Sequence, residues 1–220
     1  MDDPVKRLNR LDCCAVSDAC DKLGLRDRVA SGLEQRSTTR RIAGRAVTYR
    51  LVAADRAPLQ TGAPRHLGTT AIELAQAGDV IVVEQRTGID AGSWGGILTL
   101  GAKVRGIAGV IADGPVRDID EARAYDFPIY CRALTARTAR GRVVEAETNQ
   151  PVTIGEIEVA AGDFVIADAS GVAFIPAADI ERVLDAAEAI AAREAAMAKA
   201  LLAGTPIPQV MGGDYEFMLR

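Results

Sequence analysis

Two groups of residues in one stretch of the chain could together bind a small acid. Gly95, Gly96, Ile97 and Leu98 would open a helix, and the first N–H groups of a helix have no partner inside it. The helix dipole favours an anion at that end, and adjacent glycines let a ligand approach the backbone closely. Further along, Arg117 offers a planar guanidinium suited to a carboxylate or phosphate. These residues predict a binding site for a carboxylic acid.

Two carboxylates follow the arginine. Asp118 and Glu121 lie three residues apart, so they share one face if a helix begins there. Their hard oxygen atoms suit Mg²⁺ or Mn²⁺, so the ligand that fits all the parts is a small metal-chelating carboxylic acid. A purely structural interpretation stays open, because a Gly-Gly pair often forms only a turn and an Arg-Asp pair often forms a weak, solvated ion pair.

Other side chains in or near this stretch have simpler interpretations. His66 is the only histidine, which excludes a multi-histidine metal site within one chain and leaves a helix cap, a pocket wall or a functional role. Lys103 lies within a predicted helix, whereas a Schiff-base lysine must be desolvated. Trp94 either lines the pocket or anchors the turn. Asp113 either supports the metal ligands or, as we favour, caps a turn at Gly114-Pro115.

An α/β unit would bring these residues together. We expect a glycine turn at 92–96, an apolar helix at 97–104, a strand at 108–112 and a charged loop from Asp113 onward. Such units bind ligands at helix N-termini and at the carboxyl ends of strands. The continuous apolar run 80–84 is typical of a neighbouring strand that is buried on both faces.

The rest of the chain predicts short strands and flanking helices. We expect helices at 4–13, at 18–23 with Ser17 as N-cap and Gly24 after its end, at 66–76 and at 178–202; strands at 44–52, 128–132, 157–159, 164–167 and 172–175, with one or two more within 137–153; a polar connection at 25–37; and a loop at 55–64. With 220 residues and no internal linker, the chain predicts one domain over 1–220, with a core at about 10–203 and a short tail at 204–220.

The last helix carries an apolar stripe that a carboxylate interrupts. The stripe consists of Ile180, Val183, Leu184, Ala187, Ile190, Ala191, Met197, Ala198 and Leu201. Glu194 falls inside this stripe, where burial of a carboxylate is costly unless the group is paired or functional. Either the helix end frays and Glu194 reaches water, or its carboxylate serves the site of a neighbouring subunit.

Composition excludes several functional classes. A net charge of −4, scattered arginines and 4% aromatic residues argue against binding of nucleic acid. No apolar run approaches the ~18 residues of a membrane span, and the charged N-terminus does not resemble a signal peptide, so we expect a cytoplasmic protein. Cys13, Cys14, Cys20 and Cys131 lack zinc-site spacing and are interpreted as reduced thiols. The absence of a glycine-rich loop after the first strand argues against methyl transfer from S-adenosylmethionine.

The central residues also resemble a known family signature. Gly96, twenty intervening residues and then Arg117-Asp118-x-x-Glu121 are similar to the signature of the RraA-like family. That family includes the 4-hydroxy-4-methyl-2-oxoglutarate / 4-carboxy-4-hydroxy-2-oxoadipate aldolases and the regulator of ribonuclease activity A. Further segments resemble family blocks in family order, namely 17–24, 78–83, 127–130, 151–152 and 161–172, so the resemblance covers about 10–203.

The resemblance implies a swivelling β/β/α-type fold with a long C-terminal helix, a homotrimer or a hexamer of two such rings, and a site between subunits. In the aldolases it implies that amides equivalent to 95–98 and Arg117 hold a pyruvate-type ligand, that Asp118 holds the metal, and that a glutamate near position 194 acts across the interface. Gly96 departs from the well-studied aldolases, which carry an aspartate there that holds a water. This departure leaves the preferred reaction open.

Together these observations predict a lyase that depends on Mg²⁺ or Mn²⁺ and acts on a small 2-oxo acid. Asp118 and Glu121 would hold the metal, Gly95–Leu98 and Arg117 would bind the acid, and Arg117 and Glu194 would act in catalysis. Cleavage of a C–C bond would give pyruvate enolate, which oxaloacetate decarboxylation also produces. Two alternatives remain: a non-catalytic regulator that binds an RNase E-type partner, and a lyase, hydratase or isomerase for another hydroxy acid.

Overall fold

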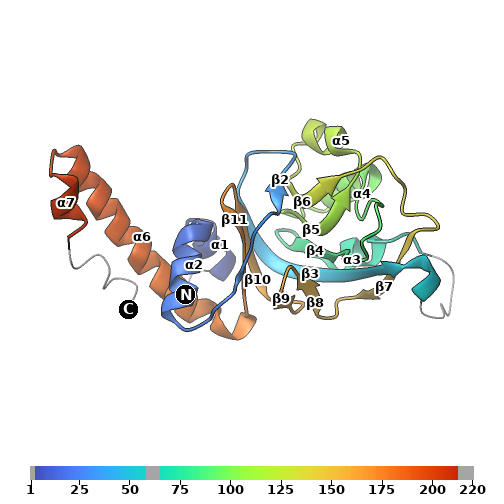
Figure 1. The fold of residues 1–220 in the computed structure, drawn as a ribbon, viewed down its shortest axis with the longest axis horizontal. Helices are drawn as coiled ribbons and strands as arrows, with labels where there is room; N and C mark the ends of the chain where they lie inside the picture. The colour runs from blue at the N-terminus through green and yellow to red at the C-terminus, as the bar shows by residue number, and fades with distance from the viewer. Residues whose placement is uncertain (1–2, 58–64, 213–220) are drawn as a thin grey trace.

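One long strand, β3 (Ile42–Ala53), joins the two halves of a curved mixed sheet (Figure 1). The structure is a computed structural model that describes residues 3–57 and 65–212. The start of β3 pairs with β10 antiparallel, its middle with β4 parallel, and its end with β7 antiparallel. The sheet order is β1-β11-β10-β3-β4-β5-β6-β2, and β8 and β9 form a separate hairpin. The other strands are β1 (Val29–Ala30), β2 (Glu34–Gln35), β4 (Val80–Glu84), β5 (Gly109–Val116), β6 (Ile129–Leu134), β7 (Val143–Thr148), β8 (Val152–Ile154), β9 (Ile157–Val159), β10 (Phe164–Asp168) and β11 (Gly171–Ile175).

Two groups of helices lie on opposite sides of the sheet (Figure 1). Three short helices cover the parallel strands: α3 (Thr69–Leu74), α4 (Gly96–Val104) and α5 (Ile119–Ala124). The other group packs on β10 and β11: α1 (Pro4–Leu8), α2 (Cys13–Lys22) and the long α6 (Ile180–Leu202), which α7 (Ile207–Val210) follows. A third apolar cluster lies between the sheet and the β8–β9 hairpin. The predicted α/β class with a long C-terminal helix is confirmed.

Helix α6 is buried only along its first half. Its stripe is buried from Ile180 to Ile190, whereas Met197, Ala198 and Leu201 are at least partly exposed in the single chain. Figure 1 shows this second half extending away from the sheet. Glu194 lies on this second half and is exposed, so within one chain its carboxylate remains in contact with water and is not destabilised by burial.

The N-terminal helices differ from the prediction because Asp12 caps the second helix in place of Ser17. The Asp12 carboxylate accepts a hydrogen bond from Ala15 N at 2.8 Å, so α2 begins at Cys13 and encloses Ser17. The helix predicted for 4–13 therefore ends at Leu8, and the one predicted for 18–23 starts earlier. Gly24 follows the helix in the left-handed conformation, as predicted.

Other element boundaries also differ between the prediction and the structure. The segment 25–37, expected to be a plain connection, contributes the two short edge strands β1 and β2. The helix expected at 66–76 is shorter, because Gly68 with φ 76° precedes it and it ends at Leu74. In the predicted loop 55–64, a single 3₁₀ turn spans 54–56, and 58–64 lie outside the described residues.

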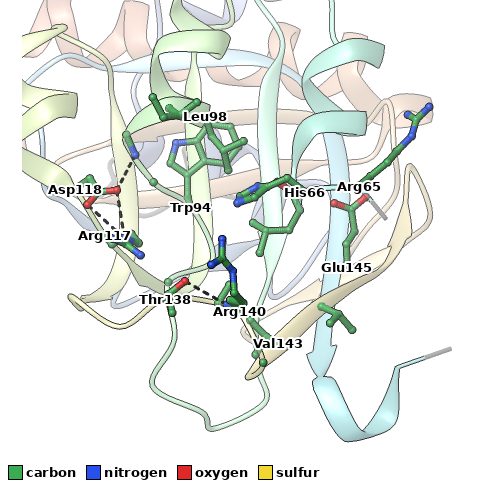
Figure 2. A pocket seen from close by; sticks show the side chains of 18 residues that line it. Arg65, His66, Trp94, Leu98, Arg117, Asp118, Thr138, Arg140, Val143 and Glu145 are labelled. Carbon is green, nitrogen blue, oxygen red and sulfur yellow. Dashed lines mark hydrogen bonds and ion pairs between the residues drawn. The ribbon is translucent and has the colours of Figure 1, made fainter. Parts of the chain in front are cut away.

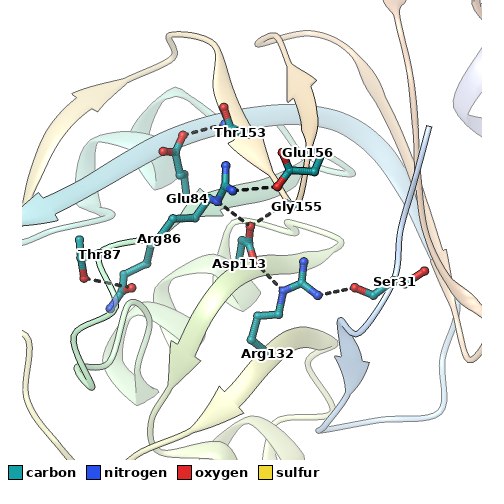
Figure 3. Close-up of polar contacts among 10 residues, drawn as sticks. Ser31, Glu84, Arg86, Thr87, Asp113, Arg132, Thr153, Gly155 and Glu156 are labelled. Atoms are coloured by element: carbon teal, nitrogen blue, oxygen red, sulfur yellow. Dashed lines mark hydrogen bonds and ion pairs between the residues drawn. The ribbon is translucent and has the colours of Figure 1, made fainter. Parts of the chain in front are cut away.

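The turn predicted at Gly114-Pro115 is wrong, because β5 continues through both residues to Val116. A Cβ on Gly114 would lie 2.7 Å from Gln85 Cβ, so glycine here permits close packing of β4 and β5. Asp113 caps no turn: its buried carboxylate accepts hydrogen bonds from Arg132 Nε at 2.6 Å and Gly155 N at 2.7 Å (Figure 3). It therefore ties the β8–β9 hairpin to the sheet.

The cysteines are free, as predicted. Cys13, Cys20 and Cys131 are buried, and Cys14 is exposed. Burial raises the pKa of the Cys20 and Cys131 thiols to about 11, so neither is a ready nucleophile near neutral pH. Among the residues that the structure describes, no helix is long and apolar enough to cross a membrane.

Candidate functional site

The site forms where the glycine turn before α4 crosses the end of β5. Ser93 donates from its backbone N and from its Oγ to Pro115 O, both at 2.8 Å. Arg117 N donates to Trp94 O at 3.0 Å, and the buried Tyr49 hydroxyl donates to Ser93 O at 2.6 Å. These bonds fix the start of α4 against the strand end, so segments about twenty residues apart in sequence meet as predicted.

Glycines make room for the Arg117 side chain. A Cβ on Gly92 would lie 2.9 Å from Arg117 Cγ, and one on Gly95 would lie 3.3 Å from the same atom. The aliphatic stem thus lies across the glycine backbone, and its Nε is 3.3 Å from the Asp118 carboxylate. Because the guanidinium is about a third exposed, it remains accessible to a ligand in the cavity.

Asp118 is the N-cap residue of α5, and its side chain reaches the N-terminus of α4. Its φ of 57° and ψ of 38° lie in the left-handed region, which costs a non-glycine residue roughly 1–2 kcal/mol. Its Oδ2 accepts a hydrogen bond from Gly96 N at 3.1 Å. In the described part of the chain, the amides of Ile97 and Leu98 have no protein acceptor, so the helix start still offers donors to a ligand.

Glu121 fills the space beside Gly96. A Cβ on Gly96 would lie only 1.8 Å from Glu121 Oε2, so this carboxylate stands where a side chain at 96 would begin. Asp118 and Glu121 therefore approach the same helix end. The described residues contain no cluster of three or more metal-ligating side chains. Two carboxylates nevertheless suit Mg²⁺, which usually keeps several waters and binds through one or two carboxylates.

A cavity of about 490 Å³ adjoins this helix end (Figure 2). Its near wall contains the predicted residues Gly95, Gly96, Ile97, Leu98, Arg117 and Asp118. Its far wall comes from two segments, 65–67 before α3 and 138–145 around the start of β7. Among the residues of the far wall, only His66 is considered from the sequence as a possible functional residue. Arg65, Arg140 and Glu145 lie in polar segments whose residue spacing does not indicate a site.

The far wall is ordered by a half-buried contact between its two segments. Glu145 accepts hydrogen bonds from Gly68 N at 2.6 Å and from the Thr148 hydroxyl. In Figure 2 the Arg140 guanidinium and the His66 imidazole point into the cavity, whereas the Arg65 side chain extends away from it. Among the described residues, Arg140 donates from its backbone N to Thr138 Oγ1 at 3.3 Å, and its guanidinium has no carboxylate partner, so it offers an unneutralised positive charge.

Three remaining candidates are placed by the structure. Trp94 serves both suggested roles, because it is 1% exposed, donates from Nε1 to Thr99 Oγ1 at 2.9 Å and also lines the cavity. Lys103 is exposed and donates to Asp126 O at 3.3 Å, so the desolvation that a Schiff-base lysine needs is missing. Glu194 lies on α6, on the other side of the molecule from α4, and does not line the cavity of its own chain (Figure 1).

Fold and site together define a class: an α/β protein in which a helix start, an arginine and an aspartate border a cavity, with Glu121 beside the same helix start. The sequence profile of the RraA-like family, described as Aldolase/RraA, matches residues 13–174. The chain therefore belongs to the RraA-like family.

Two relatives illustrate the range of this similarity. Protein DlpA of Legionella pneumophila is 26% identical over 93% of this chain, which spans only 32% of the length of DlpA. A protein of Halalkalibacterium halodurans, provisionally named 4-hydroxy-4-methyl-2-oxoglutarate aldolase, is 28% identical over 90% of this chain and 89% of its own.

Solved structures show the same fold. An uncharacterised protein from Pseudomonas syringae pv. tomato superposes with a TM-score of 0.84 at 26% identity, covering 95% of this chain and 96% of its own. Streptomyces coelicolor RraAS2, described as an unusual member of the RNase ES inhibitor RraA protein family, has a TM-score of 0.75 at 25% identity, covering 88% and 94%. The family thus contains both proteins named as aldolases and proteins named as inhibitors of RNA processing.

The contact between Gly96 and Glu121 can be tested directly. We expect Gly96→Ala to leave the protein folded, because the clashing atom ends a flexible side chain, and to weaken Mn²⁺ binding about tenfold by displacing that carboxylate. Mn²⁺ titration by calorimetry measures this, with thermal unfolding as the folding check. Gly101→Ala is the matched control, because its added Cβ would lie 3.9 Å from Ile72 Cδ1, an ordinary contact. Equal Mn²⁺ affinity in both variants would contradict a role for Glu121.

Proposed function

We propose that this protein is a divalent-metal-dependent lyase that cleaves a C–C bond in a 2-oxo acid and releases pyruvate. The substrate we favour is 4-hydroxy-4-methyl-2-oxoglutarate, with oxaloacetate decarboxylation as a side reaction. The supporting observation is the Arg117–Asp118 pair, held against the start of α4 at the edge of a cavity of about 490 Å³. A structural ion pair would not need the open cavity beside it.

The chain's own residues suffice to bind and orient the acid. The free N–H groups of Ile97 and Leu98 would donate hydrogen bonds to the carboxylate next to the 2-oxo group, where the dipole of α4 favours negative charge. Arg117 would donate to the 2-oxo oxygen, on which charge develops as the C–C bond breaks. A cation bound by Asp118 and Glu121 would supply Lewis acidity at that oxygen.

The far wall suits a substrate with a second negative group. Arg140 points into the cavity without a carboxylate partner in the described part of the chain, so it would hold a carboxylate remote from the one at α4. The five-carbon backbone of 4-hydroxy-4-methyl-2-oxoglutarate carries a carboxylate at each end, whereas a monocarboxylic acid has no second carboxylate for Arg140 to bind. Arg140 is therefore the residue that favours this substrate over a monocarboxylic acid.

Pyruvate release tests the proposed function. The protein would be supplied with 4-hydroxy-4-methyl-2-oxoglutarate and with oxaloacetate, each with Mg²⁺, with Mn²⁺ and with EDTA. We expect metal-dependent release of pyruvate from both acids, measured with a coupled lactate dehydrogenase. The absence of metal-dependent release from either acid would overturn the proposal.

We further propose that the protein assembles as a homotrimer, or as a hexamer of two trimers, in which Glu194 completes the site of a neighbouring subunit. The exposed apolar end of α6, with Leu202 at 90% exposure, supports such a contact. Glu194→Gln and Asp118→Asn should each be inactive alone. Mixed by refolding, they should regain activity, because about one site in four would combine two intact residues. Inactivity of the mixture, although size measurements show mixed oligomers, would contradict a shared site.

A second candidate function is regulation of an RNase E-type partner, which the likeness to RraAS2 favours. Such binding would use an outer surface and would not need the carboxylate in the cavity. Co-purification with the partner, unchanged by Asp118→Ala and accompanied by no pyruvate release, would support this candidate over the lyase.

A further inference from the structure

We infer that His66 is the general base that removes the proton from the substrate's hydroxyl group, a role that rests on the proposed lyase function. Cleavage of a 4-hydroxy-2-oxo acid requires a group that accepts this proton. His66 is the only histidine in the chain, and its imidazole points into the cavity from the wall that faces Arg117 and Asp118 (Figure 2). Imidazole is the side chain best suited to accept a proton near neutral pH.

The hydrogen bond of His66 selects the tautomer that a base requires. Its Nδ1 lies 3.0 Å from Leu67 O, and a carbonyl oxygen can only accept, so Nδ1 carries the hydrogen. In the neutral ring, Nε2 is then left with its lone pair free. A base held by a backbone carbonyl in this way keeps one orientation and one protonation pattern.

The segment that carries His66 is also fixed on the cavity wall. Gly68 N donates to the Glu145 carboxylate at 2.6 Å, which ties the segment to β7. Glycine suits position 68, because its φ of 76° is left-handed and an added Cβ would be crowded at 3.3 Å from both Leu98 Cδ1 and the Tyr49 hydroxyl. His66 is therefore held at a fixed place relative to the start of α4, where the acid would bind.

The other proton acceptors that line the cavity are engaged. The lining residues with a carboxylate or imidazole are Asp118, Glu145 and His66. Asp118 accepts from Gly96 N and pairs with Arg117, and Glu145 already accepts two hydrogen bonds. His66 Nε2 is thus the acceptor with no protein donor among the described residues.

The proposed step balances without any redox partner. His66 Nε2 takes the proton of the C4 hydroxyl, the C4–O bond becomes a carbonyl, and the C3–C4 bond breaks. Its electron pair moves into the enolate of the first pyruvate, which consists of C1 to C3, while C4, its methyl group and C5 leave as the second pyruvate. The protonated imidazole can return its proton to C3 of the enolate. Oxaloacetate has no hydroxyl proton to remove, so its decarboxylation does not require this base.

This difference between the two substrates gives the test. We expect His66→Gln to lower kcat for 4-hydroxy-4-methyl-2-oxoglutarate about a hundredfold, while kcat for oxaloacetate stays within about twofold of wild type. Glu73→Gln, on the adjacent helix and outside the cavity, is the matched control and should change neither reaction.

The outcomes separate the inference from the function on which it rests. Equal losses with both substrates would assign His66 a structural role and overturn the inference while the lyase function stands. Unchanged cleavage of the hydroxy acid would also overturn it. If wild type releases no pyruvate from either acid, the function fails and the inference with it. As an independent check, ¹⁵N spectra of the single imidazole should show the Nδ1–H tautomer in wild type, and the Nε2–H tautomer would contradict the inference.

Discussion

Asp118→Asn is expected to lower pyruvate release by about a thousandfold or more at ordinary Mg²⁺ concentrations, because loss of Lewis-acid assistance removes several kcal/mol of transition-state stabilisation. The substitution keeps the size of the side chain and removes the charge that would hold the cation. High Mn²⁺ should restore the activity only in part, because a neutral amide oxygen is a weaker ligand. Initial rates across Mg²⁺ and Mn²⁺ series, together with Mn²⁺ binding by calorimetry, measure both effects.

The structure explains why this variant should remain folded. Asparagine tolerates the left-handed conformation that position 118 adopts, and its side-chain oxygen can still accept from Gly96 N. Asp120→Asn is the matched control, because Asp120 is exposed on α5 and its carboxylate pairs with the exposed Arg123. If Asp118→Asn retains wild-type rates and wild-type metal dependence, the metal does not bind at Asp118 and the proposed mechanism is wrong.

The near wall of the site could be predicted because its signals are local. A glycine pair before an apolar helix, a buried strand and the arginine at its end lie within one short stretch, and strand-helix geometry brings them together. The far wall could not be predicted in the same way. Arg140 and Glu145 belong to a polar segment that meets His66 only through tertiary contacts, and the sequence pattern does not encode that pairing.

The errors in the fold have similar physical causes. Two residues, Asp12 and Ser17, could each cap a helix, and local sequence does not decide between them. Gly114-Pro115 is a common turn pair, but packing of Gly114 against Gln85 and the register shift between β5 and β6 keep both residues in the strand. Glu194 does not line the cavity of its own chain, and the role proposed for it needs a neighbouring subunit, so a single chain does not place it.

Arg117→Ala is expected to lower kcat/KM for 4-hydroxy-4-methyl-2-oxoglutarate by about a hundredfold to a thousandfold, equivalent to roughly 3–4 kcal/mol. The guanidinium would contact both the bound acid and the oxygen on which charge develops. Its loss should therefore raise KM and lower kcat together, whereas loss of ground-state binding alone would raise KM with kcat unchanged. Steady-state kinetics with both acids measure these effects.

Arg117→Lys separates charge from geometry. Lysine keeps the positive charge but not the planar fork, so we expect most of the loss to persist. Both variants should stay folded, because the side chain lies on the surface of the glycine turn and the bond from the backbone of residue 117 to Trp94 O is retained. Arg123→Ala, which removes an exposed arginine from α5, is the matched control. If Arg117→Ala instead loses activity only in proportion to a loss of folded protein, the arginine is structural, and the start of α4 must hold the acid without it.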